Sequence, residues 1–562
     1  MATGLTCTKR KYSVILASIC LGLVPYHIYW AGEIPSYSLG SQYSLPASPV
    51  SKAEDDVEFE PQNPKASSTD APTLPLEYST LTEGQQKCDL FFTTNYLEHT
   101  ATHQQPYCDA QSPSAFQCFT APRLVVPATA SWGQTDPLCI AQGVSFEPAQ
   151  AGEARDSQAS KSDCGIYSHL RPANEGQLEE FEMQCKLRDI SGERASSADA
   201  AKDLEGFRDL PTDWGWYWGD TGVGASLNTW RFSDDRNASG CTKENSNNEW
   251  VMLMRRDSTD THNLWHKLME ILQARHSFDA LRIAINPTTG TPWLSEGDAA
   301  NVQLVFDDDR EELLEPLWEI VTGKKPIRKS SLQATCLGNV ILPLPGSGSP
   351  FWSNLLDTGY QERCPSQTLL TTFVSRVFEF HGVVPRPVTE IHANPTITIV
   401  QRKKNRKFMS LDRWIPILKE RHPQSTIRVV DFADISIEEQ ILLVQSTDIL
   451  VGHHGAALTH TIFLSPESTV VEILPRYFDQ HGFRATAALR GVQYIAGRGR
   501  YEEEYENAVH GEPLPQDWPP PPPQEFNHFQ QQEWVYLTDE DFLGLVDAAV
   551  RTQLNRLGSS NL

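Results

Sequence analysis

The stretch from Thr447 to Pro475 constrains the fold more than any other part of the chain. Its apolar run Ile449–Val451 predicts a buried strand, which ends at a Gly-His-His-Gly turn and passes into a short apolar helical segment. The β-branched run Thr469–Val471 predicts the next strand. This order is typical of a βαβ unit, and such units bind ligands beyond the carboxyl ends of their strands.

The turn at residues 452–455 suits a ligand that carries phosphate. Gly452 and Gly455 have no Cβ, so the backbone can approach a ligand closely. The amides that open the next helical segment have no partner within the helix and suit phosphate oxygens. We therefore predict a nucleotide-type ligand at His453–Gly455. A structural turn, whose histidines bond only to the backbone, is an open alternative.

A zinc site is a third interpretation of this turn. His453, His454 and His460 are the potential ligands. Adjacent residues of a strand point to opposite faces, and no cysteine or acid completes the set. A metal site is therefore disfavoured.

Strands and helices alternate regularly on both sides of this unit. Residues 397–402 and 427–432 predict strands, and residues 411–421 and 435–447 predict helices. This alternation indicates a parallel, Rossmann-like sheet. The second of these helices has a capping box at Ser436 and Glu439, and residues 538–554 predict a closing helix that starts at Thr538 and Asp541.

The preceding part of the chain also predicts an α/β domain. The expected strands are residues 250–255, 280–285, 302–306 and 340–342, and the expected helices are 262–276, 310–321 and 369–383. The first of these helices should be amphipathic, with Leu264, Leu268 and Ile271 on one face. Asp307, Asp308 and Asp309 follow a strand, where they suit either a divalent metal or a cap for the next helix. Capping is favoured, because one acidic triplet is a weak metal signal.

The N-terminal residues predict a membrane anchor and a spacer. Basic residues 9–11 precede an apolar stretch, residues 12–31, that is long enough to span a bilayer. This charge pattern predicts a cytosolic tail at residues 1–11; a cleaved signal peptide is the alternative. Residues 32–85 are rich in Ser, Pro, Thr and acid and predict a disordered stem. The two α/β domains then occupy residues 86–385 and 386–562.

Charge and cysteine content narrow the class of protein. A net charge of −25 argues against nucleic acid as the main partner. Nine of the 11 cysteines lie between Cys88 and Cys364 without a CxxC pair, which predicts disulfides in an oxidising compartment. The sequon at Asn237 predicts N-glycosylation of a lumenal loop.

The string G-H-H-G-A-A-L-T-H at residues 452–460 is similar to the signature of glycosyltransferase family 61. S-T-D-I-L-V before it, and F-L-S-P and V-V-E-I-L-P after it, extend the resemblance. That family includes EGF-domain-specific O-linked N-acetylglucosamine transferases and plant xylosyltransferases. The resemblance is specific over residues 396–475, continues loosely upstream to Cys88, and does not cover the first eighty residues.

The resemblance implies an inverting glycosyltransferase with two Rossmann-like domains of the GT-B type. The expected substrates are a UDP-sugar, with N-acetylglucosamine favoured, and Ser/Thr hydroxyls of lumenal proteins. A UDP-xylose-dependent transferase acting on a polysaccharide or glycan is the alternative, and a non-catalytic lectin-like protein is an alternative of another class. No cofactor is expected to be required, and Mn²⁺ is not favoured. The expected location is the Golgi or endoplasmic reticulum membrane, with a single span of type II.

The resemblance also assigns roles to residues. Arg402 and Arg406 would bind the donor diphosphate, because guanidinium groups match phosphate oxygens; a solvated basic loop is the alternative. Apart from the resemblance, a carboxylate at a strand end can accept both hydroxyls of a ribose, so Glu472, expected to face solvent, would bind the ribose; capping a nearby backbone is its alternative role. The remaining donor contacts would come from His454, Gly455, Ala456 and Thr459. The candidates for the general base, which the N-terminal domain should supply, are His266, Asp307 and Asp309.

Overall fold

Two β-sheets organise the described part of this computed structural model. The structure describes residues 74–75, 78, 92–122, 136–147, 180–186, 221–233, 241–246, 248–257, 262–353, 367–387, 394–476, 478, 481–514 and 533–559. Everything below concerns these residues.

The C-terminal sheet has five strands, and every neighbouring pair in it is parallel. In chain order they are β10 (Thr396–Val400), β12 (Thr426–Val430), β13 (Ile449–His453), β14 (Thr469–Leu474) and β15 (Gln493–Arg498). Their order across the sheet is β12-β10-β13-β14-β15. This is the 2-1-3-4-5 order of a flavodoxin-like doubly wound sheet, so the predicted Rossmann-like sheet is confirmed.

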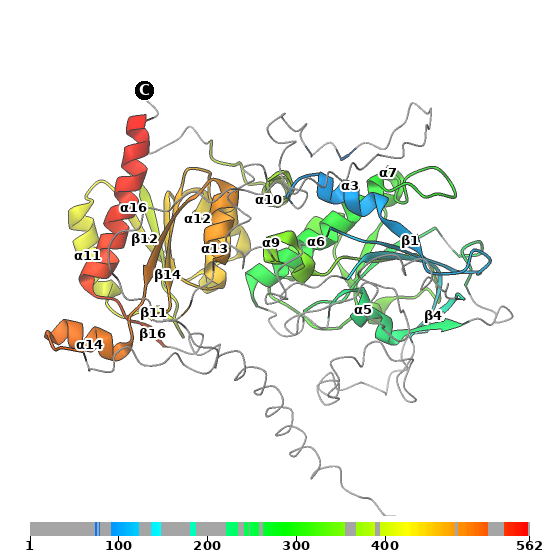
Figure 1. Cartoon of the computed structure of the whole chain (residues 1–562), viewed down its shortest axis with the longest axis horizontal. Helices are drawn as coiled ribbons and strands as arrows, with labels where there is room; N and C mark the ends of the chain where they lie inside the picture. Colours follow the sequence, from blue (N-terminus) through cyan, green and yellow to red (C-terminus); the bar gives the residue numbers. More distant parts are fainter. Residues whose placement is uncertain are drawn as a thin grey trace, which may run out of the picture. The chain divides into compact units, whose positions relative to one another are not determined.

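Helices cover both faces of this sheet (Figure 1). On one face, α11 (Leu411–Arg421) and α16 (Asp539–Ser559) pack against Val451 and Val471. On the other lie α12 (Ile437–Gln445), α13 (Gly482–Arg490) and the 3₁₀ helix η10 (Ala456–Phe463), against Leu450 and Val470. Because both faces are covered, both sets of alternating side chains are apolar. The remaining elements are η9 (Phe432–Asp434), α14 (Glu502–His510) and the parallel pair β11 (Lys407–Phe408) and β16 (Trp534–Val535).

Both predicted helix starts in this region are confirmed. The Ser436 hydroxyl accepts the amide hydrogen of Glu439, and the Glu439 carboxylate accepts that of Ser436. Thr538 and Asp541 form the same reciprocal pair at the start of α16. Each pair satisfies two amides that the helix itself cannot.

The N-terminal sheet has nine strands and is mixed. Its strands are β1 (Gln104–Pro106), β2 (Ala115–Phe119), β3 (Leu138–Phe146), β4 (Phe181–Gln184), β5 (Trp230–Ser233), β6 (Trp250–Met254), β7 (Gln303–Phe306), β8 (Ile327–Arg328) and β9 (Cys336–Leu342). The main path runs β1-β2-β3-β9-β6-β7-β8. Strands β9, β6, β7 and β8 are parallel, but β3 joins β9 antiparallel and β2 joins β3 antiparallel. A second purely Rossmann-like sheet is therefore not found here, because antiparallel strands extend the parallel part.

The shorter helical elements surround this sheet. They are α3 (Asn95–Thr102), α5 (Gly222–Ser226), η3 (Leu227–Thr229), α7 (Glu296–Ala299), η4 (Glu315–Trp318), α8 (Glu319–Thr322), η5 (Lys329–Ser331), η6 (Gly346–Gly348), α9 (Pro350–Ser353) and α10 (Thr368–Phe380). The predicted helix at 369–383 is thus confirmed as α10.

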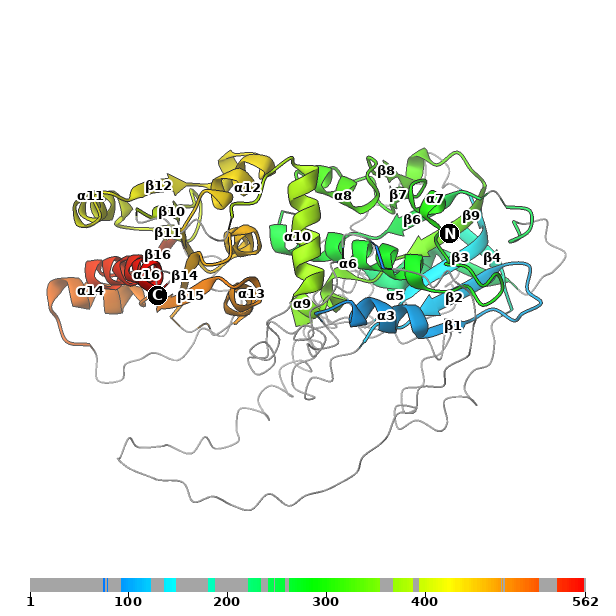
Figure 2. The ribbon, with the colours of Figure 1, turned by 90° about the horizontal axis from the view of Figure 1, so that it is seen from above.

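The central helix of this region is α6, residues Leu264–Ile283, with α8 and α10 beside it (Figure 2). The strand expected at residues 280–285 is wrong, because α6 continues to Ile283. Phe278, Ala280 and Leu281 are all buried and continue the apolar side chains of the helix, and no glycine or proline interrupts it.

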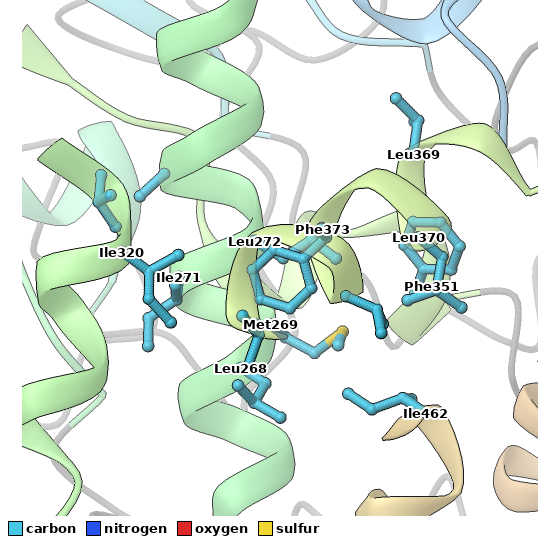
Figure 3. Close-up of a cluster of buried hydrophobic side chains, with 14 of the residues drawn as sticks. Leu268, Met269, Ile271, Leu272, Ile320, Phe351, Leu369, Leu370, Phe373 and Ile462 are labelled. Atoms are coloured by element: carbon cyan, nitrogen blue, oxygen red, sulfur yellow. The ribbon is translucent and has the colours of Figure 1, made fainter. Parts of the chain in front are cut away.

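The amphipathic pattern expected for α6 is also wrong, since nearly every residue of this helix is buried. Figure 3 shows its apolar side chains meeting those of four other helices, namely Leu268, Met269, Ile271 and Leu272 of α6 with Ile320 of α8, Phe351 of α9, Leu369, Leu370 and Phe373 of α10, and Ile462 of η10. Most polar residues of α6 are buried as well, and some, such as Lys267 and Glu270, bind each other.

The helix predicted at residues 310–321 forms only in its second half. Residues up to Leu314 are irregular, and Pro316 lies in the first turn of η4, where its missing amide hydrogen is tolerated. The aspartates before this segment do not cap a helix. Asp308 instead binds Arg256 and Arg310, and Asp307 binds Arg255 and Lys329.

Three disulfides join parts of the N-terminal region: Cys108–Cys185, Cys118–Cys139 and Cys241–Cys336. The prediction of bridges in this half is confirmed. Tyr78 belongs to the predicted stem, yet it is buried and donates to Asp279 at 2.6 Å, so folded structure begins before residue 86. Among the residues described, no helix is long and apolar enough to cross a membrane. The predicted span at residues 12–31 and the sequon at Asn237 lie outside these residues.

Candidate functional site

The topology of the C-terminal sheet brings two predicted segments together. Strand β10 leads to α11 on one face, and β13 leads to η10 on the other, although the two strands are neighbours. At such a switch point the two connections diverge and leave a crevice at the carboxyl ends of the strands. Arg402 follows β10, and His454 and Gly455 follow β13.

Two guanidinium groups lie against the backbone of Gly455. A Cβ placed on this glycine would lie 2.7 Å from Nη1 of Arg406 and 3.6 Å from Nη1 of Arg402. Arg406 Nη1 donates to the carbonyl oxygen of His454 at 3.0 Å. Gly455 has φ of 153° and Arg406 has φ of 56°, so both backbones adopt conformations that few side-chain-bearing residues use. The predicted convergence of these residues at one turn is therefore found in the structure.

This turn is a place where negative charge would be stabilised. Burial lowers the pKa of Arg402, which the Asp431 carboxylate opposes, and the guanidinium keeps its charge. Ala456 begins η10, so the first amides of that helix face the same turn as the two arginines. Arginine forks and helix-opening amides are the groups that bind phosphate oxygens.

His453 is buried in this turn and bonds to its backbone. Its ring is buried, and Nδ1 donates to the carbonyl oxygen of His454 at 2.9 Å. Burial, together with the nearby Arg406 charge, holds the pKa of His453 well below its ordinary value. The ring is therefore neutral at physiological pH, when Nδ1 carries its single proton.

His454 is held from inside the protein. Its Nδ1 lies 2.5 Å from Oε1 of Glu472, and the hydroxyl of Tyr494 donates to Oε2 of the same carboxylate at 2.7 Å. Burial and the Glu472 charge raise the pKa of Tyr494, so this phenol stays a donor. Phe478 and Phe483 pack against the imidazole, with ring centroids at 4.7 and 5.3 Å.

Two of the predicted donor contacts are buried. Glu472 is 0% exposed, so the expectation that it faces solvent is wrong; both of its oxygens are engaged by protein groups. The reason is that every residue of β14 is covered on both faces. Thr459 is also fully buried, on η10. Their roles toward a donor stay predictions.

The three candidate bases of the N-terminal region lie in different environments. His266, in the first turn of α6, is buried, and its Nδ1 lies 2.7 Å from Oδ2 of buried Asp257. Asp307 is bound by Arg255 and Lys329. Asp309 is exposed and accepts from the Ser330 hydroxyl at 2.6 Å.

Aromatic rings connect the start of α6 with the turn after β13. The Trp265 ring packs edge-on against Phe483 at 6.1 Å, and Phe483 packs against His454. His266 therefore directly follows Trp265, which is linked to His454 through the single ring of Phe483. Among the described residues, no such ring contact leads from Asp307 or Asp309 to the turn. Sequence spacing alone does not separate these three candidates.

A cavity of about 390 Å³ lies elsewhere, along the second half of α6. Arg275 and Arg282 line it, with Arg376 and Phe380 from α10. At 1.5 Å per helical residue, Arg275 lies roughly 14 Å along the axis from His266. No residue of the turn lines this cavity. No group of histidine, cysteine and acidic side chains able to hold a metal occurs within the described ranges.

Two residues of these arrangements were not singled out from the sequence. Asp257 follows β6 by three positions, and nothing in the linear pattern links it to His266. Tyr494 reaches Glu472 because β14 and β15 pair in parallel, with Glu472 opposite Ala496. Strand register sets that contact, and a single sequence does not specify it.

Comparisons with known proteins match a segment of the chain that contains this turn. The family model of glycosyltransferase 61 matches residues 262–471. An EGF domain-specific O-linked N-acetylglucosamine transferase from Xenopus laevis is 33% identical over 134 residues, which is 24% of this chain and 25% of the relative. An alpha-1,3-arabinosyltransferase from Oryza sativa subsp. japonica is 32% identical over 106 residues, 18% of each chain. A beta-1,2-xylosyltransferase from Arabidopsis thaliana is 30% identical over 91 residues, 16% of this chain and 17% of the relative.

The matched segments therefore span a quarter or less of these three relatives. The family match begins at the start of α6 and ends on β14, so it contains both His266 and the turn with its arginines. All three relatives are named as glycosyltransferases. Residues 262–471 of this chain are thus similar to the glycosyltransferase 61 family.

Proposed function

We propose that the protein transfers a sugar from a nucleotide-sugar donor whose diphosphate binds at the turn after β13. The observation that carries this proposal is the approach of Arg402 and Arg406 to the Gly455 backbone at the switch point of the sheet. In glycosyl transfer the leaving diphosphate gains negative charge as the glycosidic bond breaks. Fixed guanidinium groups and amides stabilise that charge most in the transition state.

The diphosphate assignment is tested by removing one guanidinium. Arg402→Ala should raise the dissociation constant for UDP roughly ten- to a hundredfold, since a charge-assisted hydrogen bond contributes about 1.5–3 kcal/mol. Lys404→Ala is the matched control, because it removes an exposed cation of the same loop. Calorimetry with UDP measures both. Equal UDP affinity in the two variants would refute the proposed donor site.

We propose UDP-N-acetylglucosamine as donor and protein Ser/Thr hydroxyls as acceptor. The name of the Xenopus laevis relative supports this choice. The names of the two plant relatives support the second candidate, a pentosyl transfer from UDP-xylose or a similar donor to a glycan. A panel of UDP-sugars distinguishes the two, since the correct donor alone should be turned over. A lectin-like protein would bind sugar but hydrolyse none of these donors.

We propose His266 as the general base of an inverting displacement within a GT-B arrangement. The acceptor oxygen attacks the anomeric carbon, its proton passes to the base, and the bond to the diphosphate oxygen breaks with its electrons. The ring contacts from Trp265 through Phe483 to His454 support this choice over the aspartates. His266→Ala should lower kcat about 10²- to 10⁴-fold and leave UDP affinity unchanged. A fall in UDP affinity with unchanged kcat would exclude the assignment.

We propose that the enzyme acts in the lumen of the Golgi or endoplasmic reticulum, held there by an N-terminal type II anchor. The three disulfides of the N-terminal region support an oxidising compartment. Sensitivity of the mature protein to a glycosidase that removes N-glycans, lost in Asn237→Gln, would place the catalytic part in the lumen. Full digestion by protease added to sealed microsomes would place it in the cytosol instead.

A further inference from the structure

A buried chain of three side chains connects adjacent strands of the C-terminal sheet. Tyr494 of β15 donates to Glu472 of β14, and Glu472 binds Nδ1 of His454, which follows β13. An ionised carboxylate can only accept hydrogen bonds, and Tyr494 already supplies one donor. The second bond is satisfied when the proton resides on His454 Nδ1. Nε2 is then the ring nitrogen that Glu472 does not engage.

The same histidine is joined to the cationic turn by its backbone. Its carbonyl oxygen accepts from Arg406 Nη1, so His454 and the two arginines belong to one hydrogen-bonded arrangement. Phe478 and Phe483 restrict the plane of the imidazole. Glu472 is 0% exposed, and its two oxygens are engaged by His454 and Tyr494. Its bond to His454 is the contact through which it reaches the turn.

We propose that Tyr494 and Glu472 are positioning residues that fix the proton on Nδ1 of His454, so that Nε2 serves the diphosphate of the nucleotide-sugar donor. This inference rests on the proposed function. When Nε2 also carries a proton, the Glu472 carboxylate stabilises the resulting imidazolium, which donates to a diphosphate oxygen.

The bond changes are those of ordinary glycosyl transfer. The glycosidic carbon–oxygen bond breaks, and its electron pair stays on the diphosphate oxygen. The acceptor oxygen forms the new bond to the same carbon, and its proton goes to the general base. The His454 Nε2 proton is shared with the diphosphate oxygen by a hydrogen bond that strengthens as charge develops there. His454 thus touches the leaving group, and Glu472 acts one step behind it.

Two substitutions of His454 separate its ring nitrogens. Asparagine keeps a donor near the Nδ1 position, so the buried Glu472 stays bonded, but it lacks an Nε2 equivalent. His454→Asn of the full chain should unfold near the wild-type temperature and bind UDP at least tenfold more weakly. Glutamine places its amide nearer the Nε2 position and leaves Glu472 unpaired. His454→Gln should therefore lose thermal stability. The opposite pattern, stable glutamine and unstable asparagine with normal UDP affinity, would overturn the proposal.

The positioning pair is tested with Glu472→Gln and Tyr494→Phe. Both should lower kcat about tenfold, the effect of losing an outer partner of a functional histidine. Tyr78→Phe is the matched control, because its hydroxyl also donates to a buried carboxylate, that of Asp279, in the other sheet region. It should lower stability without lowering kcat. Imidazole ¹⁵N shifts should show the Nδ1–H form for His454 in the wild type and a shift toward Nε2–H in Glu472→Gln, with the His454 signals identified by their loss in His454→Asn.

The outcomes distinguish this inference from the proposed function. If Arg402→Ala leaves UDP affinity unchanged, the donor site itself is misplaced. If Arg402→Ala weakens UDP binding while kcat and the His454 ¹⁵N shifts are unchanged in both Glu472→Gln and Tyr494→Phe, the donor site stands and the positioning pair is refuted.

Discussion

Gly455 has an unusual backbone conformation and also leaves room for two arginine side chains. Its φ of 153° is outside the range that side-chain-bearing residues usually adopt, and a Cβ there would contact the Arg406 guanidinium. The glycine therefore lets the two guanidinium groups lie close to its backbone. Replacement would disturb the position of the charges before it disturbs the sheet.

Gly455→Ala should accordingly weaken UDP binding about tenfold or more, because the new methyl group displaces the Arg406 side chain. Gly323→Ala is the control: Gly323 also has positive φ, at 71°, but a Cβ there meets no atom within 4 Å. Both variants should lose about 1 kcal/mol or more of stability through backbone strain. Titration calorimetry and thermal unfolding measure the two effects. Unchanged UDP affinity in both variants would contradict the donor site.

Sequence reasoning at this scale predicted which residues meet at the turn, but not how deeply they are buried. The arginine pair, His454 and Gly455 were predicted as one group, because the ends of parallel strands meet at one edge of a sheet. Glu472 was expected at the surface. Its burial depends on α13 and η10, whose apolar side chains share one core cluster with Val470 of β14, and on the register that brings Tyr494 beside it. A strand pattern encodes neither.

At the scale of elements, a buried charge network joins α6 to the ends of β6 and β7. Lys267 binds Glu270 at 3.0 Å and Glu312 at 3.2 Å, and all three are buried. Burial by itself would raise the pKa of Asp308, but hydrogen bonds from Arg256 and Arg310 outweigh it and lower that pKa to about 2. The acids after β7 thus anchor a loop through arginines.

The stability of this network should depend on pH. The folded pKa of Asp308 lies below its unfolded value, so its contribution is present above about pH 4 and is lost as pH falls toward 2. Asp308→Asn should lower the unfolding free energy by about 2 kcal/mol at pH 7, and by progressively less below pH 4. Asp309→Asn is the control, since that exposed acid binds only a serine hydroxyl in the described contacts. Urea titrations at several pH values decide it; a pH-independent difference between Asp308→Asn and wild type would contradict the prediction.

The elements that sequence reasoning missed share one cause. Residues 280–283 were assigned to a strand and the residues of α6 to an amphipathic helix, because both inferences assumed that one face meets water. In the structure α6 is surrounded by protein, and tertiary packing overrides the pattern. The parallel strands of the C-terminal sheet were easier to predict, since fully buried strands appear as continuous apolar runs bounded by turns.

At the scale of the whole molecule, we expect transfer to proceed without a chelated metal. Arg402, Arg406 and the opening amides of η10 supply the positive charge, and the acids after β7 are bound by arginine, lysine and serine. Turnover should therefore survive EDTA, as measured with the purified full chain and its donor. The expectation is wrong if EDTA abolishes turnover, Mn²⁺ restores it, and Asp307→Asn removes this dependence of turnover on Mn²⁺.

The position of helix α16 at the end of the chain affects how the C-terminal sheet folds during synthesis. It covers one face of β13, β14 and β15, where Phe542 stacks on Trp414 at 4.1 Å, and Gln553 donates to Thr469 at 2.8 Å. Strand β16, just before it, completes a ladder with β11. During synthesis on the ribosome, the parallel sheet emerges long before this covering helix. Its apolar face then stays open until residues 539–559 leave the exit tunnel, and a premature stop before Asp539 would leave it open permanently, as a target for chaperones and degradation.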